Sequence, residues 1–145
     1  MILAAGERFV IDASVAVKWV APEADSDRAA MLLECRLVVP DLLFAECANV
    51  IWKKLRLGNL TEEEARIAAQ TLEDADFSVV PTKPYLSRAV AIATVLEHPA
   101  YDAMYLAVAE ALDLCLVTAD DRLIRQIRRA PGGFSHLALL LSEIV

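Results

Sequence analysis

Four carboxylates in this chain stand where a folded protein could bring them together. Asp12 ends the first apolar run, Asp102 lies early in a helical segment, Asp120 follows a later apolar run, and Glu46 lies inside the least polar helical segment. Converging carboxylates repel one another unless a cation neutralises them, and oxygen ligands without His or Cys favour Mg²⁺ or Mn²⁺ over zinc. A divalent ion bound to a phosphodiester can orient water and stabilise charge. These residue types therefore predict metal-assisted phosphodiester chemistry.

Each carboxylate also has a plain structural explanation. Asp102 and Asp120 could simply favour the positive end of a helix dipole. Glu46 could lie on a solvated helix face, although its neighbours are almost all apolar. Asp12 is harder to explain in this way, because a carboxylate at the mouth of a buried strand needs a partner or a metal. The residues alone leave both readings open.

The elements that must position these groups can be read from hydrophobic periodicity. Short apolar runs predict strands at 8–12, 37–39, 77–80 and 114–117, with a last strand at 134–137. Helical spacing predicts helices at 13–20, 25–35, 42–57, 61–75, 85–97, 101–112 and 120–129. Strands that alternate with helices imply right-handed crossovers and a mainly parallel sheet covered on both faces. The predicted class is α/β, with ligands expected at the carboxyl ends of the strands.

Two helix starts carry capping signals. Asp41 stands directly before the helix at 42–57 and is expected to cap it. Thr61 precedes a run of three glutamates, so that Thr61 and Glu64 predict a capping box.

Composition sets the limits of the fold and its surroundings. The 145 residues, 57% of them apolar, are enough for a single domain over 1–145 with a sizeable core. No apolar run reaches the length of a membrane span and no signal peptide is recognisable, so we expect a cytoplasmic protein with no membrane contact. The three cysteines, Cys35, Cys47 and Cys115, lie in apolar runs and are expected to be small core residues.

Net charge argues against a general nucleic-acid-binding surface but leaves local basic clusters. The formal charge is −7, so any contact with nucleic acid should depend on local patches. Two such patches are present, each explicable as a solvated helix face or as a phosphate-contacting stripe: Lys53, Lys54 and Arg56, and Arg122, Arg125, Arg128 and Arg129. Trp19 and Trp52 are expected to be core or interface residues rather than base-stacking ones, and His98 and His136 to be structural.

Four separated motifs resemble a known family. The motifs are VIDAS at 10–14, PDLLFAECAN at 40–49, YDAMYLA at 101–107 and LVTAD at 116–120. In order and spacing they resemble the PIN-domain ribonucleases, and among these the VapC toxins of prokaryotic toxin–antitoxin pairs. The resemblance implies a three-layer α/β/α PIN domain with a central, mainly parallel sheet of four to five strands. It also implies a Mg²⁺- or Mn²⁺-dependent endoribonuclease that cuts single-stranded or loop RNA and is inhibited by a cognate VapB-like antitoxin. The apolar surplus of the chain suggests an exposed patch for homodimerisation and for binding that antitoxin.

The resemblance also assigns roles to residues. Asp12, Glu46, Asp102 and Asp120 would bind the metal and form the catalytic set, while the Ser14 and Thr118 hydroxyls would hydrogen-bond the carboxylates beside the cofactor. Asn49 would be a weaker candidate for a substrate contact. Because Asp121 directly follows Asp120, either carboxylate could occupy the fourth position.

Two other functions remain open on the sequence. A catalytically silent PIN-fold module could bind RNA or protein without cutting it. An aspartate-based phosphotransfer domain, such as a receiver or a HAD-type phosphatase, is less well supported, because a HAD enzyme needs a second Asp at position 14, where this chain has serine.

Overall fold

The chain folds around a sheet of five parallel strands. The computed structural model describes all residues, 1–145. The strands are β1 (Arg8–Ile11), β2 (Arg36–Pro40), β3 (Ser78–Val80), β4 (Cys115–Thr118) and β5 (Ala138–Leu140). They pair in the order β3-β2-β1-β4-β5, and every pair is parallel. Ile11 aligns with Val117 across the β1–β4 pair, so the residues that follow, Asp12 and Thr118, leave the sheet side by side.

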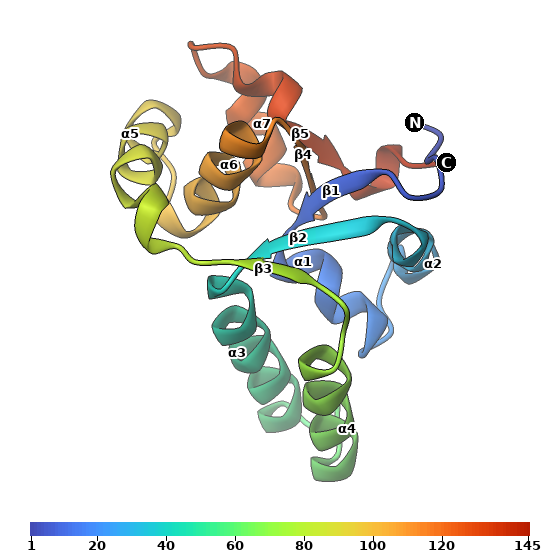
Figure 1. The fold of residues 1–145 in the computed structure, drawn as a ribbon. Helices are drawn as coiled ribbons and strands as arrows, with labels where there is room; N and C mark the ends of the chain where they lie inside the picture. The colour runs from blue at the N-terminus through green and yellow to red at the C-terminus, as the bar shows by residue number, and fades with distance from the viewer.

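Helices cover both faces of this sheet, as the α/β prediction requires. On one side lie α1 (Ala13–Ala16), α2 (Ser26–Met31), α3 (Leu42–Arg56) and α4 (Glu62–Glu73), and on the other α5 (Leu86–Leu96), α6 (Ala100–Leu112) and α7 (Asp121–Arg129) (Figure 1). The chain runs from β1 through β2 to β3 in one direction and then returns to β4, and right-handed crossovers put the two sets of helices on opposite faces. The predicted three-layer arrangement is confirmed.

The core is densest around the central strands and α6. Val10, Ile11, Val39 and Leu116 are fully buried, as expected for parallel strands covered on both faces. The middle of α6 is buried over Tyr105–Ala109 and packs on β1, β2 and β4. A helix this apolar belongs inside the protein, and its position fixes the acidic residue in its first turn against the sheet.

The last strand was predicted in the wrong place. Residues Phe134–Leu137 form a 3₁₀ helix, and β5 begins one residue later, at Ala138. Phe134 and Leu137 are buried, whereas the two residues between them are exposed. That spacing of three matches the 3₁₀ period rather than the alternation of a strand. Short 3₁₀ turns also extend α1 at Val17–Trp19, extend α2 at Leu32–Glu34, and form Lys83–Tyr85 and Leu141–Glu143.

The two capping predictions had different outcomes. Thr61 forms the predicted capping box, in which its hydroxyl accepts the Glu64 backbone N–H and the Glu64 carboxylate accepts the Thr61 backbone N–H. Asp41 occupies the N-cap position of α3 but its side chain makes no cap bond. Its carboxylate instead accepts the backbone N–H of Thr82, 3.2 Å away, and so links the end of β2 to the loop after β3.

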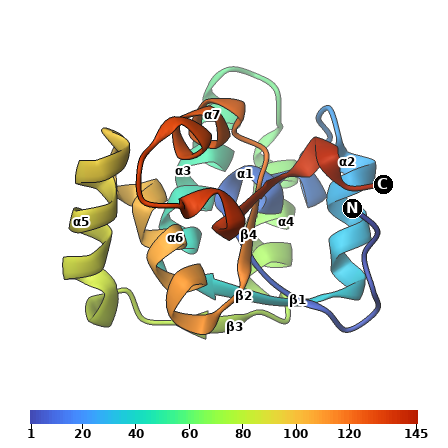
Figure 2. The same ribbon diagram turned by 90° about the horizontal axis from the view of Figure 1, so that it is seen from above.

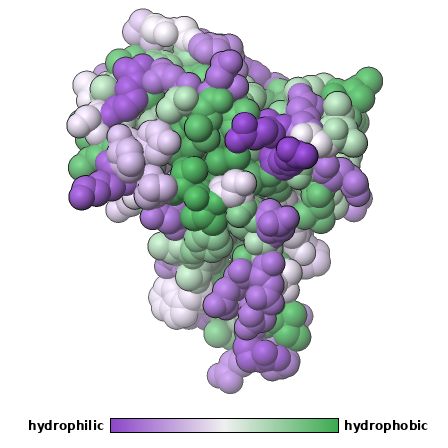
Figure 3. Space-filling model, viewed as in Figure 1, coloured by the Kyte–Doolittle hydropathy of each residue, from purple (hydrophilic) through white to green (hydrophobic).

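The termini meet at the amino end of the sheet, away from the ends of the strands where ligands are expected. Met1 and Val145 are hydrogen-bonded through their backbones, and both views show the two ends together (Figure 2). Hydrophobic and hydrophilic atoms are mixed at this corner, whereas the outer surface of α4 is mainly hydrophilic (Figure 3). None of the helices has both the length and the apolar composition to cross a membrane.

Candidate metal centre

The four predicted carboxylates line one pocket. The open cavity, about 250 Å³ in volume, lies where the carboxyl ends of β1 and β4 meet the second and third turns of α3 and the amino-terminal ends of α6 and α7. Its walls are Asp12, Ala13, Ser14, Glu46, Asn49, Val50, Asp102 and Asp120. The chain reverses its direction across the sheet at this point, as at the ligand-binding crevices of other open α/β sheets.

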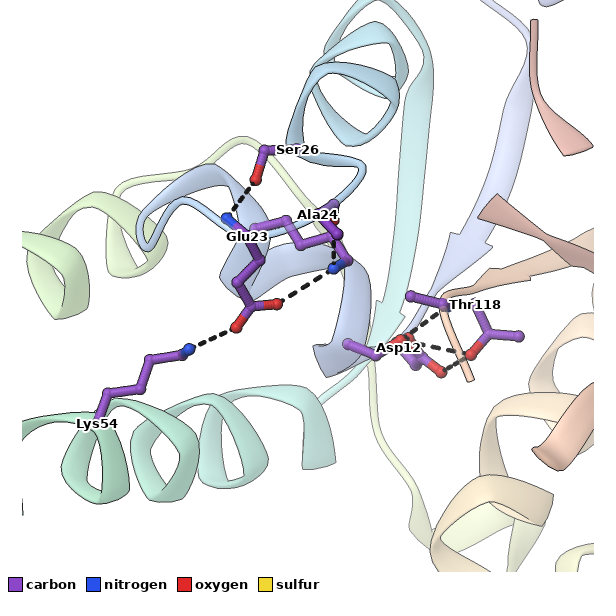
Figure 4. Close-up of polar contacts among 9 residues, drawn as sticks. Asp12, Glu23, Ala24, Ser26, Lys54 and Thr118 are labelled. Atoms are coloured by element: carbon purple, nitrogen blue, oxygen red, sulfur yellow. Dashed lines mark hydrogen bonds and ion pairs between the residues drawn. The ribbon is translucent and has the colours of Figure 1, made fainter. Parts of the chain in front are cut away.

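Asp12 is held rigidly at the floor of the pocket. Its side chain is 5% exposed, and the Ser14 and Thr118 hydroxyls each donate a hydrogen bond of 2.5 Å to a different carboxylate oxygen (Figure 4). The same hydroxyls accept backbone N–H groups, Ser14 from Ala119 at 2.9 Å and Thr118 from Asp120 at 3.1 Å. Because each hydroxyl accepts from the backbone, its proton is directed at Asp12. Ser14 and Thr118 therefore lie beside the carboxylate, as predicted.

The burial of Asp12 has an electrostatic cost. Burial raises the pKa of Asp12 from 3.8 to about 6, the Ser14 and Thr118 hydrogen bonds oppose this rise, and the charges of Asp102 and Glu46 add to it. Because burial destabilises the ionised form of this carboxylate, a nearby cation would stabilise it.

Glu46 is half-buried and lines the pocket. The Tyr105 hydroxyl donates a hydrogen bond of 2.6 Å to Glu46 Oε1. Burial, and after it the charge of Asp102, raises the pKa of Glu46, while the Tyr105 hydrogen bond lowers it. Glu46 therefore does not lie on a fully solvated helix face. Sequence reasoning missed Tyr105, although it follows Asp102 by three residues on α6, the spacing that places two side chains on one helix face.

Asp102 is held by a residue that the sequence analysis treated only as structural. The ring of His98 is nearly buried; its Nε2 contacts Asp102 Oδ2, and its Nδ1 contacts Gln126 Oε1 on α7. Both ring nitrogens are therefore engaged. The spacing of four between His98 and Asp102 is the sequence signal that could have revealed the pair.

Asp120 is the fourth carboxylate of the pocket. It caps α7 by accepting the backbone N–H groups of Arg122 and Leu123, at 2.9 and 3.1 Å. Single ligand atoms of His98, Asp102 and Asp120 lie within 4.8 Å of one another, while Asp12 and Glu46 line the same pocket outside this tight group. Asp121 is exposed and is not part of the pocket wall.

This set of groups fits a divalent cation. Four carboxylates face one small space, and no Lys or Arg side chain lines it, so nothing in the wall offsets their charge. Carboxylate oxygens are the ligands that Mg²⁺ and Mn²⁺ take in proteins. Three of the carboxylates are held by other side chains, Asp12 by Ser14 and Thr118, Glu46 by Tyr105, and Asp102 by His98. Such supporting contacts are typical of metal ligands.

The remaining sequence candidates are distributed as follows. Trp19 is a core residue that stacks on Phe77 with ring centroids 5.9 Å apart, and its indole N–H donates to the Ala29 carbonyl. Trp52 is exposed, which excludes the core for this residue and leaves the interface part of the prediction untested. All three cysteines are free; Cys47 is buried, and Cys35 and Cys115 are partly buried.

Comparison with known proteins identifies relatives over most of the chain. The family model of the PIN domain matches residues 9–129. "Ribonuclease VapC3" of Pyrobaculum aerophilum is 34% identical over 121 residues, which cover 80% of this chain and 92% of the relative. "Ribonuclease VapC1" of Mycobacterium tuberculosis is 32% identical over 127 residues, 85% of this chain and 90% of the relative.

Solved structures share the fold. The crystal structure of PAE2754 from Pyrobaculum aerophilum superposes with a TM-score of 0.69 at 26% identity, covering 95% of this chain and 85% of that one. The VapBC2 complex of Rickettsia felis, bound to a DNA fragment from its promoter, contains a chain with a TM-score of 0.62 at 13% identity, covering 92% and 98%. At that identity the second likeness concerns the fold alone.

Proposed function

This chain belongs to the PIN domain family, and from that premise we propose that it is a VapC-like toxin, an endoribonuclease that uses Mg²⁺ or Mn²⁺ to cut single-stranded or loop RNA. One observation carries the proposal: Asp12, Glu46, Asp102 and Asp120, widely separated in the sequence, line a single pocket without a basic side chain. The relatives named as VapC ribonucleases support the choice of reaction.

The residues of the pocket have different roles in this proposal. Asp12 and Asp102 would hold the cation directly, and Glu46 and Asp120 would complete the negatively charged wall of the pocket. When bound, Mg²⁺ or Mn²⁺ would orient water toward the phosphorus and offset charge on the phosphate oxygens. Ser14 and Thr118 keep the two oxygens of Asp12 in place.

Glu46 has a further role that its hydrogen bonding supports. Tyr105 occupies Oε1 and leaves Oε2 to accept a proton from water or to align it. For this Glu46 must be ionised, and the Tyr105 hydrogen bond favours the ionised form.

A protein partner is part of the same proposal. Solved structures with this fold include toxin–antitoxin complexes, and we propose that a cognate VapB-like antitoxin silences this chain, that the chain forms a homodimer, and that both act in the cytoplasm, where RNA is accessible. An open groove of about 310 Å³ between α3 and α4 supports an apolar partner segment, since six of its seven lining residues are hydrophobic: Phe44, Cys47, Ala48, Ile51, Ala69 and Leu72, with Glu73. A basic side chain from the antitoxin could also enter the acidic pocket.

The alternatives separate in one experiment. Membership of the PIN family removes the phosphotransfer domain, and a silent binding module differs from a nuclease only in cutting. Total RNA is incubated with the wild-type protein, with Asp102→Asn and with the matched surface variant Asp121→Asn, in Mg²⁺, in Mn²⁺ and in chelator, and new 5′ ends are mapped.

The proposal predicts defined new ends with wild type and Asp121→Asn in either metal, and none with Asp102→Asn or in chelator. Cutting that persists in chelator or in Asp102→Asn would reject the metal mechanism. No cutting by the wild-type protein, freed of any antitoxin, would favour the silent module.

A further inference from the structure

The outer face of α3 carries a stripe of polar and aromatic side chains that begins in the acidic pocket. Glu46 and Asn49 line the pocket, and Trp52, Lys53 and Arg56 follow at intervals of three and four residues. Residues three, four and seven apart lie on one face of a helix. The stripe therefore leads from the site of proposed chemistry along the helix to its carboxyl end.

Two positively charged side chains on this stripe form no ion pair within the molecule. Lys53 and Arg56 are exposed and take part in none of the ion pairs. Their neighbour Lys54 points elsewhere and binds Glu23, with Nζ 2.5 Å from the carboxylate (Figure 4). In a chain of net charge −7, free cations beside an acidic pocket leave a local surface that can hold an anion.

Trp52 adds a flat aromatic surface at the same place. Its side chain is 52% exposed, and the Arg56 guanidinium carbon lies 5.2 Å from its ring centroid. Nothing in the core requires this indole, unlike that of Trp19. Exposed aromatic rings beside Lys and Arg are the elements with which proteins hold single-stranded nucleic acid, because bases stack on the ring while the cations contact phosphates.

We propose that the α3 stripe, defined as Asn49, Trp52, Lys53 and Arg56, binds the single strand of RNA that leads out of the metal pocket; this inference rests on the proposed nuclease function. Lys53 and Arg56 contact phosphates, and Trp52 stacks on an unpaired base. A helix rises 1.5 Å per residue, so Lys53 lies about 10 Å beyond Glu46 along the axis. The stripe therefore contacts nucleotides close to the scissile bond and favours unpaired RNA.

The surroundings favour RNA over a protein as the occupant of this stripe. The apolar groove between α3 and α4 uses a different side of the helix, including Phe44, Cys47 and Ile51. The stripe itself offers an amide, two free cations and one indole, which complement phosphate and base rather than an apolar side chain.

Binding can be measured without cleavage. A fluorescein-labelled 12-mer of oligouridylate is titrated with protein in chelator, and anisotropy is recorded at several salt concentrations. We expect Lys53→Gln and Arg56→Gln each to weaken binding several-fold and to reduce the slope of log K against log [salt] by about 0.7, the contribution of one phosphate contact on a single strand. Trp52→Ala should weaken binding by at least about fivefold and abolish RNA-induced quenching of tryptophan fluorescence.

Lys54→Gln is the matched control, because it removes the same charge from the next residue of the same helix. It should change affinity by less than about twofold and leave the salt slope unaltered, since Lys54 is already paired. An equal loss with Lys54→Gln, or no binding by wild type, would overturn the proposal. So would unchanged RNA affinity in Trp52→Ala together with a change of mass in sedimentation, which would assign the stripe to contact between copies.

Cleavage kinetics keep this inference separate from the nuclease proposal. In Mg²⁺ or Mn²⁺ the stripe variants should raise KM about as much as they weaken binding and leave kcat within about twofold. Binding that depends on the stripe in a protein that never cuts would sustain the stripe and reject the nuclease. An unchanged KM in Trp52→Ala and Lys53→Gln would reject RNA binding by the α3 stripe and leave the proposed nuclease function in place.

Discussion

Replacement of Asp12 by asparagine should stabilise the metal-free protein at neutral pH while it destroys the metal site. The pKa of Asp12 is about 6 in the folded protein, against 3.8 for the unperturbed group. Below about pH 3.8 Asp12 is protonated in both the folded and the unfolded state, and it does not lower the free energy of unfolding. As pH rises toward 6 the unfolded chain releases its proton first, so the native state progressively loses stability. Asparagine cannot ionise and avoids this loss.

The magnitude follows from the size of the pKa difference. About two pKa units, at 1.36 kcal/mol each, correspond to a cost of about 3 kcal/mol above pH 7. Asparagine offers one acceptor oxygen in place of two, so that either Ser14 or Thr118 must reorient its hydroxyl, at a cost of about 1 kcal/mol. The expected net effect is an increase of about 1–2 kcal/mol in the free energy of unfolding.

Urea unfolding in chelator measures this effect at two pH values. At pH 7.5 Asp12→Asn should have the higher midpoint; at pH 4 the difference should vanish or reverse, because wild-type Asp12 is then protonated in the folded state. On addition of Mn²⁺ the wild-type protein should be stabilised and Asp12→Asn should not. Asp121→Asn, an exposed change, should respond to Mn²⁺ like wild type.

Lower stability of Asp12→Asn than of wild type at pH 7.5 in chelator would refute the argument that burial strains this carboxylate. Equal stabilisation of both proteins by Mn²⁺ would refute the assignment of Asp12 as a ligand.

Three further substitutions test other parts of the structure. Tyr105→Phe removes the hydrogen bond that lowers the pKa of Glu46, so the pH–rate profile should keep its shape with its acidic limb shifted to higher pH; an unmoved limb would mean that Glu46 does not titrate in the reaction. His98→Ala frees the carboxylate of Asp102 and should weaken Mn²⁺ binding about tenfold or more in calorimetry, whereas unchanged affinity would make the contact purely structural. Thr61→Ala breaks the capping box of α4 and should lower the free energy of unfolding by about 1 kcal/mol without affecting cleavage; loss of activity in a folded protein would contradict this.

The site residues that the sequence predicts are those that lie at the ends of strands and helices. Asp12 follows a buried parallel strand, Asp102 lies in the first turn of α6, and Asp120 is the N-cap of α7. In an α/β sheet these positions meet at one edge, so local patterns are enough to bring them together. Glu46 was recognised because a lone carboxylate in an otherwise apolar helix is costly to bury unless it has a partner or a function.

The contacts that sequence did not predict depend on tertiary packing. Tyr105 reaches Glu46 across 59 residues and His98 reaches Gln126 across 28, and no local period encodes such pairs. The last strand was misplaced because four residues with two buried apolar ends fit a 3₁₀ turn and a short strand equally well until the packing against α7 is known. Trp52 was expected to be a core or interface residue, and only the structure shows that its indole is exposed and so lies outside the core.

The central claim is that Asp12, Glu46, Asp102 and Asp120 form one divalent-cation site. Titration of metal-free protein with Mn²⁺, followed by the loss of the free-ion signal in electron paramagnetic resonance, tests it without reference to any substrate. The account predicts saturable binding by the wild type and by Asp121→Asn, and at least about tenfold weaker binding by Asp12→Asn and Asp102→Asn. Equal Mn²⁺ affinity in all four proteins, or none in the wild type, would contradict it.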